Sequence, residues 1–143
     1  MSKSNFENLR VYRLAETVAD DVWEIVIEWD AFAKSTVGKQ LVRSADSVGA
    51  NIAEGNGRGT YADNRRFVRT ARGSLKETRH WLRRAFRRKL LSAKQVEKLR
   101  NLLDSLSPQL NAYLESIGTK EKKSPAPISL GSSFPVSKKA LAR

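Results

Sequence analysis

Apolar residues recur every three or four positions along most of the chain, as they do on one face of an α-helix. Four such stretches predict helices over residues 6–29, 37–56, 61–89 and 93–117. Short segments rich in Gly, Ser and Asp separate them. Four helices with short links predict an all-α, up-and-down four-helix bundle. We expect the bundle to occupy residues 1–118, and we expect residues 119–143 to form a disordered basic tail because Lys, Ser and Pro recur there without periodicity.

The first predicted helix has apolar residues on two of its sides. One set recurs at core-facing positions from Val11 to Trp29. A second set, on a different side, consists of Leu9, Tyr12, Trp23 and Ile27. A helix that is apolar on two sides needs two partners. We therefore predict that the second set contacts another helix or forms the interface of an oligomer.

Several signals set the expected helix boundaries. Residues 30–38 are predicted to be a connection, and the glycines at 55, 57 and 59 are predicted to end the second helix through a left-handed C-cap. Thr60 and Ser92 begin capping-box patterns and predict the starts of the third and fourth helices. Gly118 is expected to end the fourth helix, and Pro108 to kink it.

The third predicted helix carries cations along one side. They follow one another at steps of 3 or 4 residues, which places them in a stripe roughly 80° wide and about 33 Å long. We call this group the cationic stripe, and its members are Arg65, Arg69, Arg72, Lys76, Arg79, Arg83 and Arg87. No acidic residue lies within it. A separate apolar arc consists of Phe67, Val68, Ala71, Leu75, Leu82, Ala85 and Phe86.

The positive charge of the chain is concentrated in this helix. The chain has 27 basic and 15 acidic residues, and segment 61–89 contains 11 of the basic and 2 of the acidic ones. Such a field favours polyanions, above all nucleic acid. Most of these cations are arginines, whose planar fork binds phosphate through two bonds. If all seven stripe cations met the phosphates of single-stranded RNA, log affinity would fall with log salt at a slope of about −5.

An acidic ridge on the first helix competes with nucleic acid for these cations. The ridge consists of Glu16, Asp20, Glu24 and Glu28, at four-residue steps, with Asp21 beside them. It could pair with the cationic stripe in the same bundle or across a subunit interface. Such exposed pairs contribute only about 0–1 kcal/mol each, but they select partners and register. Nucleic-acid binding is the favoured interpretation, because the ridge has too few acids to neutralise the basic helix.

Two segments of the bundle resemble a known family. They are Asn-Ile-Ala-Glu-Gly at 51–55 and Gly-Ser-Leu-Lys-Glu at 73–77, and the opening Leu-Arg-Val-Tyr at 9–12 also matches. The chain, over about residues 6–118, resembles the four-helix-bundle family of large-subunit ribosomal RNA intervening-sequence proteins. That family includes relatives of the accessory variability determinant of diversity-generating retroelements. The resemblance implies a ring, typically a homopentamer, without catalytic activity. For the retroelement relatives it also implies a basic surface that engages RNA and a partner reverse transcriptase.

Other function classes have little support in the sequence. Cysteine is absent and His80 is the only histidine, so we expect no metal and no cofactor. Glu54 and Glu77 are the best candidates for a catalytic pair, but they lack a nucleophile or histidine base, and we predict that the protein is not an enzyme. No apolar run could span a bilayer, and we expect a cytoplasmic protein that binds RNA, with DNA as an alternative.

Two features near the basic helix have competing interpretations. The glycines at 55, 57 and 59 lack the strand that precedes a phosphate-binding loop, so helix capping is favoured. Arg58 and the amides near Thr60 are nevertheless candidates to hold one phosphate of a larger ligand. Trp81 and Trp23 are expected to pack partly buried or to contact another subunit, with base stacking by Trp81 as the weaker alternative.

Overall fold

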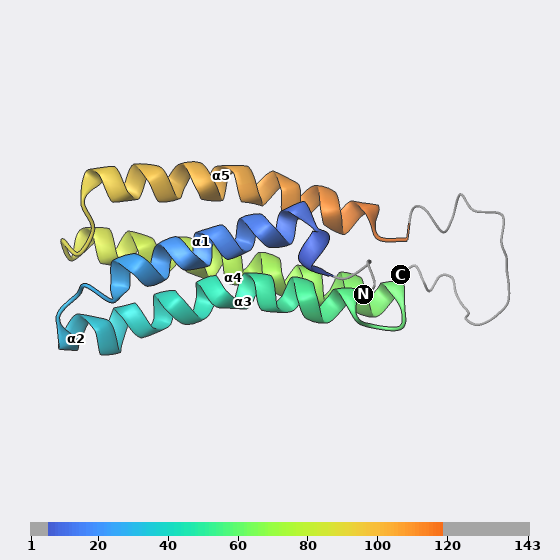
Figure 1. Ribbon diagram of the computed structural model, residues 1–143, viewed down its shortest axis with the longest axis horizontal. Coiled ribbons are helices and arrows are strands. Elements are labelled where there is room, and N and C mark those ends of the chain that lie inside the picture. The colour runs from blue at the N-terminus through green and yellow to red at the C-terminus, as the bar shows by residue number, and fades with distance from the viewer. Residues whose placement is uncertain (1–5, 119–143) are drawn as a thin grey trace, which may run out of the picture.

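The computed structural model describes residues 6–118, and these residues form a bundle of long helices lying side by side (Figure 1). A 3-10 turn, η1 (Phe6–Asn8), precedes α1 (Arg10–Val26). The chain continues through α2 (Ala31–Ala33), the π-helical turn η2 (Lys34–Gly38), α3 (Lys39–Asn56), α4 (Tyr61–Arg87) and α5 (Ala93–Ser116). The predicted all-α four-helix bundle is thus confirmed. The predicted tail, 119–143, lies outside the described residues.

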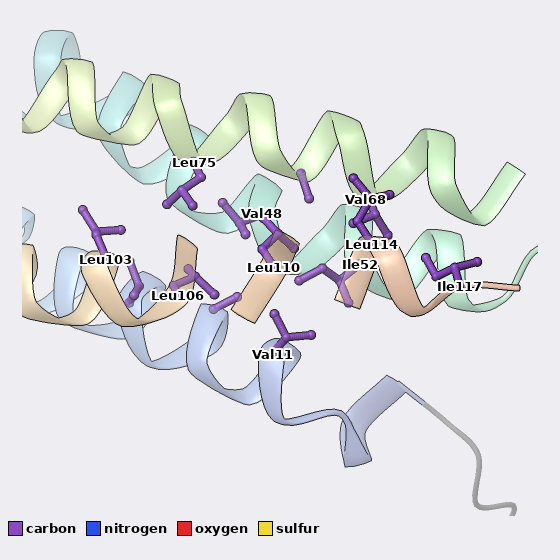
Figure 2. Close-up of a cluster of buried hydrophobic side chains, with 13 residues drawn as sticks. Val11, Val48, Ile52, Val68, Leu75, Leu103, Leu106, Leu110, Leu114 and Ile117 are labelled. Carbon is purple, nitrogen blue, oxygen red and sulfur yellow. The ribbon is translucent and has the colours of Figure 1, made fainter. Parts of the chain in front are cut away.

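Each long helix packs against two others. Helix α1 contacts α3 and α5, and α4 contacts the same two helices, so α1 and α4 are diagonal to each other. The larger of two buried clusters lies where all four meet, and includes Val11, Ile52, Val68 and Leu110 (Figure 2). A second cluster joins Val22, Val26, Leu41, Ala45 and Leu99. Aliphatic side chains from every long helix therefore form the core that holds the outer faces in position.

Residues 31–38 are helical, so the prediction of a connection over residues 30–38 is wrong beyond the N-cap residue, Asp30. The Asp30 carboxylate accepts a hydrogen bond from the Ala33 amide at 3.0 Å and caps the start of α2. The chain then passes without a break through η2 into α3. A glycine is needed at position 38, because a Cβ there would lie only 2.8 Å from Val26 Cγ1 and would clash with it. A π-helical turn has more residues per turn than an α-helix, so the start of this helix does not follow the 3.6-residue spacing that predicts helices.

The glycines at 55, 57 and 59 do not provide the predicted left-handed cap. Gly57 ends α3 with a φ of −91°, and among the described residues Gly118, after α5, is the glycine with positive φ. Gly55 lies inside α3 and is buried. There, an added Cβ would come within 2.6 Å of Asn64 Oδ1 and 2.9 Å of Phe67 Cβ. This glycine is explained by the close approach of α3 to α4.

The predicted starts of the last two helices are confirmed. Ser92 and Gln95 form both hydrogen bonds of a capping box before α5. The Thr60 hydroxyl accepts a hydrogen bond from the Asp63 amide at 3.1 Å and begins α4. The Asp63 carboxylate pairs with Arg66 at 3.3 Å. Helix α5 continues through Pro108 and ends at Ser116, two residues before Gly118, which was expected to end it.

Candidate nucleic-acid interface

The cationic stripe lies along the outer side of α4. The opposite side of this helix is buried against the rest of the bundle through Val68, Ala71 and Leu75. Five of the seven stripe members are exposed, and Arg65 and Arg79 are half-buried, so the stripe lies on the solvent side of the helix, as the amphipathic pattern predicted. The structure divides the stripe into two rows, because one edge of it borders α5.

Three arginines on the α5 side of the stripe are bound to that helix. Arg65 Nη1 donates to the Ile117 carbonyl at 3.2 Å, and Arg72 Nη1 donates to Asn111 Oδ1 at 3.3 Å. Arg79 Nη2 forms an ion pair with Asp104 Oδ1 at 3.1 Å. These arginines recur every seven residues, so they line one seam between antiparallel helices. Their first role is to join α4 to α5.

The other four stripe members form what we call the free cation row. It consists of Arg69, Lys76, Arg83 and Arg87, and all four side chains are exposed. Within residues 6–118 none of them has a hydrogen-bond or ion-pair partner. From Arg69 to Arg87 the row extends about 27 Å at 1.5 Å per residue. These cations are therefore available to an external anion.

Arg58 is held by its own chain. Its Nη1 lies 2.9 Å from Glu54 Oε2, and its Nε lies 4.0 Å from Asp63 Oδ2. Its guanidinium also lies over the Phe67 ring, 5.3 Å from the ring centroid. These contacts tie the α3–α4 link together. To bind a phosphate, as predicted, Arg58 would have to exchange them.

Glu16, Asp20 and Glu24 of the acidic ridge lie on α1, which is diagonal to α4, and Glu28 lies in the turn that follows α1. Because the two helices are diagonal, pairing between ridge and stripe within one chain is wrong: in the described part of the chain no ion pair joins them. Asp21, beside the ridge, instead pairs with Lys98 of α5 at 3.4 Å. On α3, burial raises the pKa of the Asp46 carboxyl, and the negative charge of Asp20 raises it further.

The four predicted interface residues fall into two groups. Leu9 and Tyr12 are partly buried and pack against the large core cluster of their own chain. Trp23 and Ile27 are exposed, with 53% and 38% of their surface accessible. Trp23 and Ile27 line a groove of about 250 Å³ between α1 and α3, together with Val42. Of the four, only Trp23 and Ile27 present a substantial exposed apolar surface.

The remaining candidate residues are held by near neighbours. Glu54 pairs with Arg58, and Glu77 accepts a hydrogen bond from the indole of Trp81 at 3.1 Å. Trp81 also packs against the smaller core cluster, in agreement with the packing role expected for it. The exposed His80 ring meets the Trp81 ring edge to face at 4.8 Å. Among residues 6–118 no cluster of acidic or histidine side chains is arranged to hold a metal ion.

Phe86 is a surface residue that sequence reasoning placed on the apolar arc. Its side chain is 47% exposed, unlike that of the buried Val68 or Ala71 of the same arc. The available signal was its sequence context, since Phe86 stands within a run of arginines. None of the helices in the described part of the chain is long and apolar enough to span a membrane.

Fold and surface together define a four-helix-bundle protein with a cationic outer helix. The family model of the 23S rRNA-intervening sequence proteins matches residues 7–112, and the chain belongs to this family. The resemblance found in the sequence is thus confirmed. Among solved structures, the chain is similar to a protein of unknown function from the S23 ribosomal protein family of Bacteroides thetaiotaomicron, with a TM-score of 0.66 and 23% identity. That match covers 73% of this chain and 98% of the other, and it shows a shared fold. No curated protein matches.

Proposed function

We propose that this protein is a non-enzymatic RNA-binding protein and that it binds RNA phosphates through the free cation row of α4. The observation that supports this proposal is that Arg69, Lys76, Arg83 and Arg87 are exposed and have no hydrogen-bond or ion-pair partner within the described part of the chain. Like charges along a helix destabilise it slightly, so stability alone does not account for the row. The family's name, which refers to sequences within 23S rRNA, supports RNA as the polyanion.

The division of the stripe changes the expected strength of binding. Four phosphate contacts per subunit, at about −0.7 each, give a salt slope of about −3 on single-stranded RNA. The slope of −5 expected for seven contacts would require the three bound arginines to leave α5. We propose further that subunits close into a ring, as a homopentamer, which would multiply these modest contacts by the number of engaged subunits.

The test replaces the free cation row with glutamine: Arg69→Gln, Lys76→Gln, Arg83→Gln and Arg87→Gln in one variant. Binding to a single-stranded oligonucleotide of about eight nucleotides is measured against salt concentration. We expect the slope to fall from about −3 to near zero. The matched control removes the same charge from exposed positions on α1 and α5, through Arg10→Gln, Arg13→Gln, Lys94→Gln and Lys98→Gln. We expect the control to keep most of the slope.

Two outcomes would contradict the proposal. Equal loss of binding in both variants would mean that net charge, rather than the row, attracts RNA. A slope near zero for the wild-type protein would exclude phosphate binding altogether. Light scattering on each variant shows whether a loss of binding reflects a loss of assembly.

A second candidate function is a purely structural oligomer, in which the basic helix pairs with acidic ridges of neighbouring subunits. The observation that favours it is the position of the ridge on the side of the bundle away from α4, where only another molecule could bring the two together. In that case the glutamine variant dissociates into monomers. A more specific version of the RNA-binding proposal is an accessory protein for a retroelement reverse transcriptase. A reverse-transcriptase gene with template and variable repeats beside the coding gene would support it.

A further inference from the structure

The contacts between α4 and α5 follow a seven-residue repeat. Arg65, Arg72 and Arg79 reach positions 117, 111 and 104 of the antiparallel helix. The next residue of this repeat on α4 is Phe86. The row of arginines that borders α5 thus ends in an aromatic ring, in the last turn of the helix. Phe86 therefore lies at one end of the cationic stripe rather than in the core.

The ring of Phe86 lacks the ring or guanidinium partners that cover Phe6 and Phe67. Phe67 has the guanidinium groups of Arg58 and Arg66 over its face at 5.3 and 4.7 Å. Phe6 meets Tyr12 edge to face at 4.9 Å. Within residues 6–118, Phe86 has neither an aromatic nor a cationic neighbour of this kind, and it is not one of the buried residues of either core cluster. With 47% of its surface exposed, it offers a free aromatic surface.

Two members of the free cation row stand close to Phe86 along α4. Arg83 precedes Phe86 by about one helical turn, and Arg87 follows it, both in the free cation row. The helix ends just beyond, where Lys89 adopts a φ of +64° and the Leu90 amide donates to the Ala85 carbonyl at 2.9 Å. The helix dipole favours cations within the last turn of a helix, so it favours Arg87 here but does not explain the row as a whole. The dipole gives no reason for an exposed phenyl ring among them.

We propose that Phe86 is a stacking position for an unpaired base of a single-stranded nucleic acid, with Arg83 and Arg87 on the neighbouring phosphates. The inference rests on the proposed RNA-binding function and narrows its substrate class to single strands. An aromatic ring set among cations is the arrangement by which proteins hold single strands without sequence specificity. In a duplex the bases are already stacked on each other, so a ring on the protein surface gains nothing there.

The experiment compares two RNA probes of equal length, one single-stranded and one fully paired. Phe86→Ala should weaken binding of the single strand about 5- to 150-fold, the fold-change that corresponds to one stacked base. Binding of the duplex and the salt slope should not change, because no cation is removed. Phe86→Trp should keep the affinity of the wild type for the single strand, whereas Phe86→Leu, which is apolar but not aromatic, should lose it. The control is Phe32→Ala, since Phe32 is 77% exposed and lies outside the cationic stripe.

Some results would contradict base stacking on Phe86 without contradicting the proposed RNA-binding function. One is a wild-type protein that binds both probes with the expected salt slope while Phe86→Ala changes neither affinity. Another is a Phe86→Ala variant that loses single strand and duplex equally. Dissociation of the Phe86→Ala oligomer in light scattering would show that the ring contacts another subunit. A wild-type protein that binds neither probe would contradict the proposed function itself.

Discussion

At the scale of single residues, two glycines of the bundle differ in the space around them: Gly55 is tightly packed and Gly73 is open. At Gly55 an added Cβ would lie 2.6 Å from Asn64 Oδ1 and 3.0 Å from the Asn64 carbonyl oxygen, so the backbone of α3 fits against α4 only without a side chain. At Gly73, within α4, an added Cβ would meet no atom within 4 Å. One glycine is required by packing, and the other leaves an exposed helix position without a side chain.

The same substitution should therefore have opposite effects at these two positions. Gly55→Ala should lower the free energy of unfolding by up to about 2 kcal/mol, because an overpacking cost of about 1–3 kcal/mol exceeds the helix-propensity gain of about 1 kcal/mol. Gly73→Ala should raise it by about 0.5–1 kcal/mol. Urea denaturation of both variants measures the difference. Equal shifts in the same direction would show that the close contact at Gly55 relaxes freely.

The sequence did not predict which side chains of the cationic stripe contact the neighbouring helix. The spacing of the stripe is a local property, and it placed all seven cations on one side of α4 correctly. Which of them lie beside α5 depends on how α4 is rotated in the bundle, and helical spacing does not define this rotation. The partners Asp104 and Asn111 stand 25 and 39 residues away from Arg79 and Arg72. The exposure of Phe86, a member of the predicted apolar arc, was not predictable for the same reason.

At the scale of elements, the helix that was expected to begin near residue 37 begins at Asp30. The Asp30 side chain accepts from the Ala33 amide, and η2 carries the chain from this start into α3. Phe32, at 77% exposure, faces solvent in the first turn, and only Ala33 and Val37 of the apolar residues in this segment are buried, so its apolar pattern is short. The other helix starts were predictable because Thr60 and Ser92 precede periodic apolar stretches.

This cap can be tested with a matched pair of substitutions. Asp30→Ala should lower the free energy of unfolding by about 1 kcal/mol, because the Ala33 amide loses its acceptor. Asp30→Asn should remain close to the wild type, since asparagine caps a helix about as well as aspartate. Thermal unfolding followed by circular dichroism compares the two. If the asparagine variant is as unstable as the alanine variant, the carboxylate charge matters more than the hydrogen bond.

At the scale of the whole molecule, the two charged surfaces lie on diagonal helices. The acidic ridge is on α1 and the free cation row is on α4, which are separated by α3 and α5. Complementary surfaces on opposite sides of a subunit form head-to-tail contacts, and such contacts build rings when the rotation closes. A ring built in this way would pair the free cation row with the ridge of the next subunit, as the second candidate function requires. The exposed Trp23 and Ile27, also on α1, add an apolar surface on which a neighbouring subunit can pack.

The proposed ring should therefore depend on this apolar surface. Replacing Trp23 and Ile27 together with alanine should shift the mass measured by light scattering to that of the monomer. The helical circular dichroism signal should persist, because neither residue is buried. Phe32→Ala serves as the control, since it removes a more exposed aromatic residue outside the predicted interface set. An unchanged mass of the double variant would place the subunit contact elsewhere.

The diagonal placement of acids and cations also affects how a single subunit meets a polyanion. Charge of opposite sign on opposite sides gives the molecule a large electric dipole moment across the bundle. In the field of a nucleic acid, a torque acts on this dipole and turns the cationic helix toward the phosphates before any contact forms. Fewer collisions are then lost to wrong orientations, and the association rate rises above that of a molecule with the same net charge spread evenly.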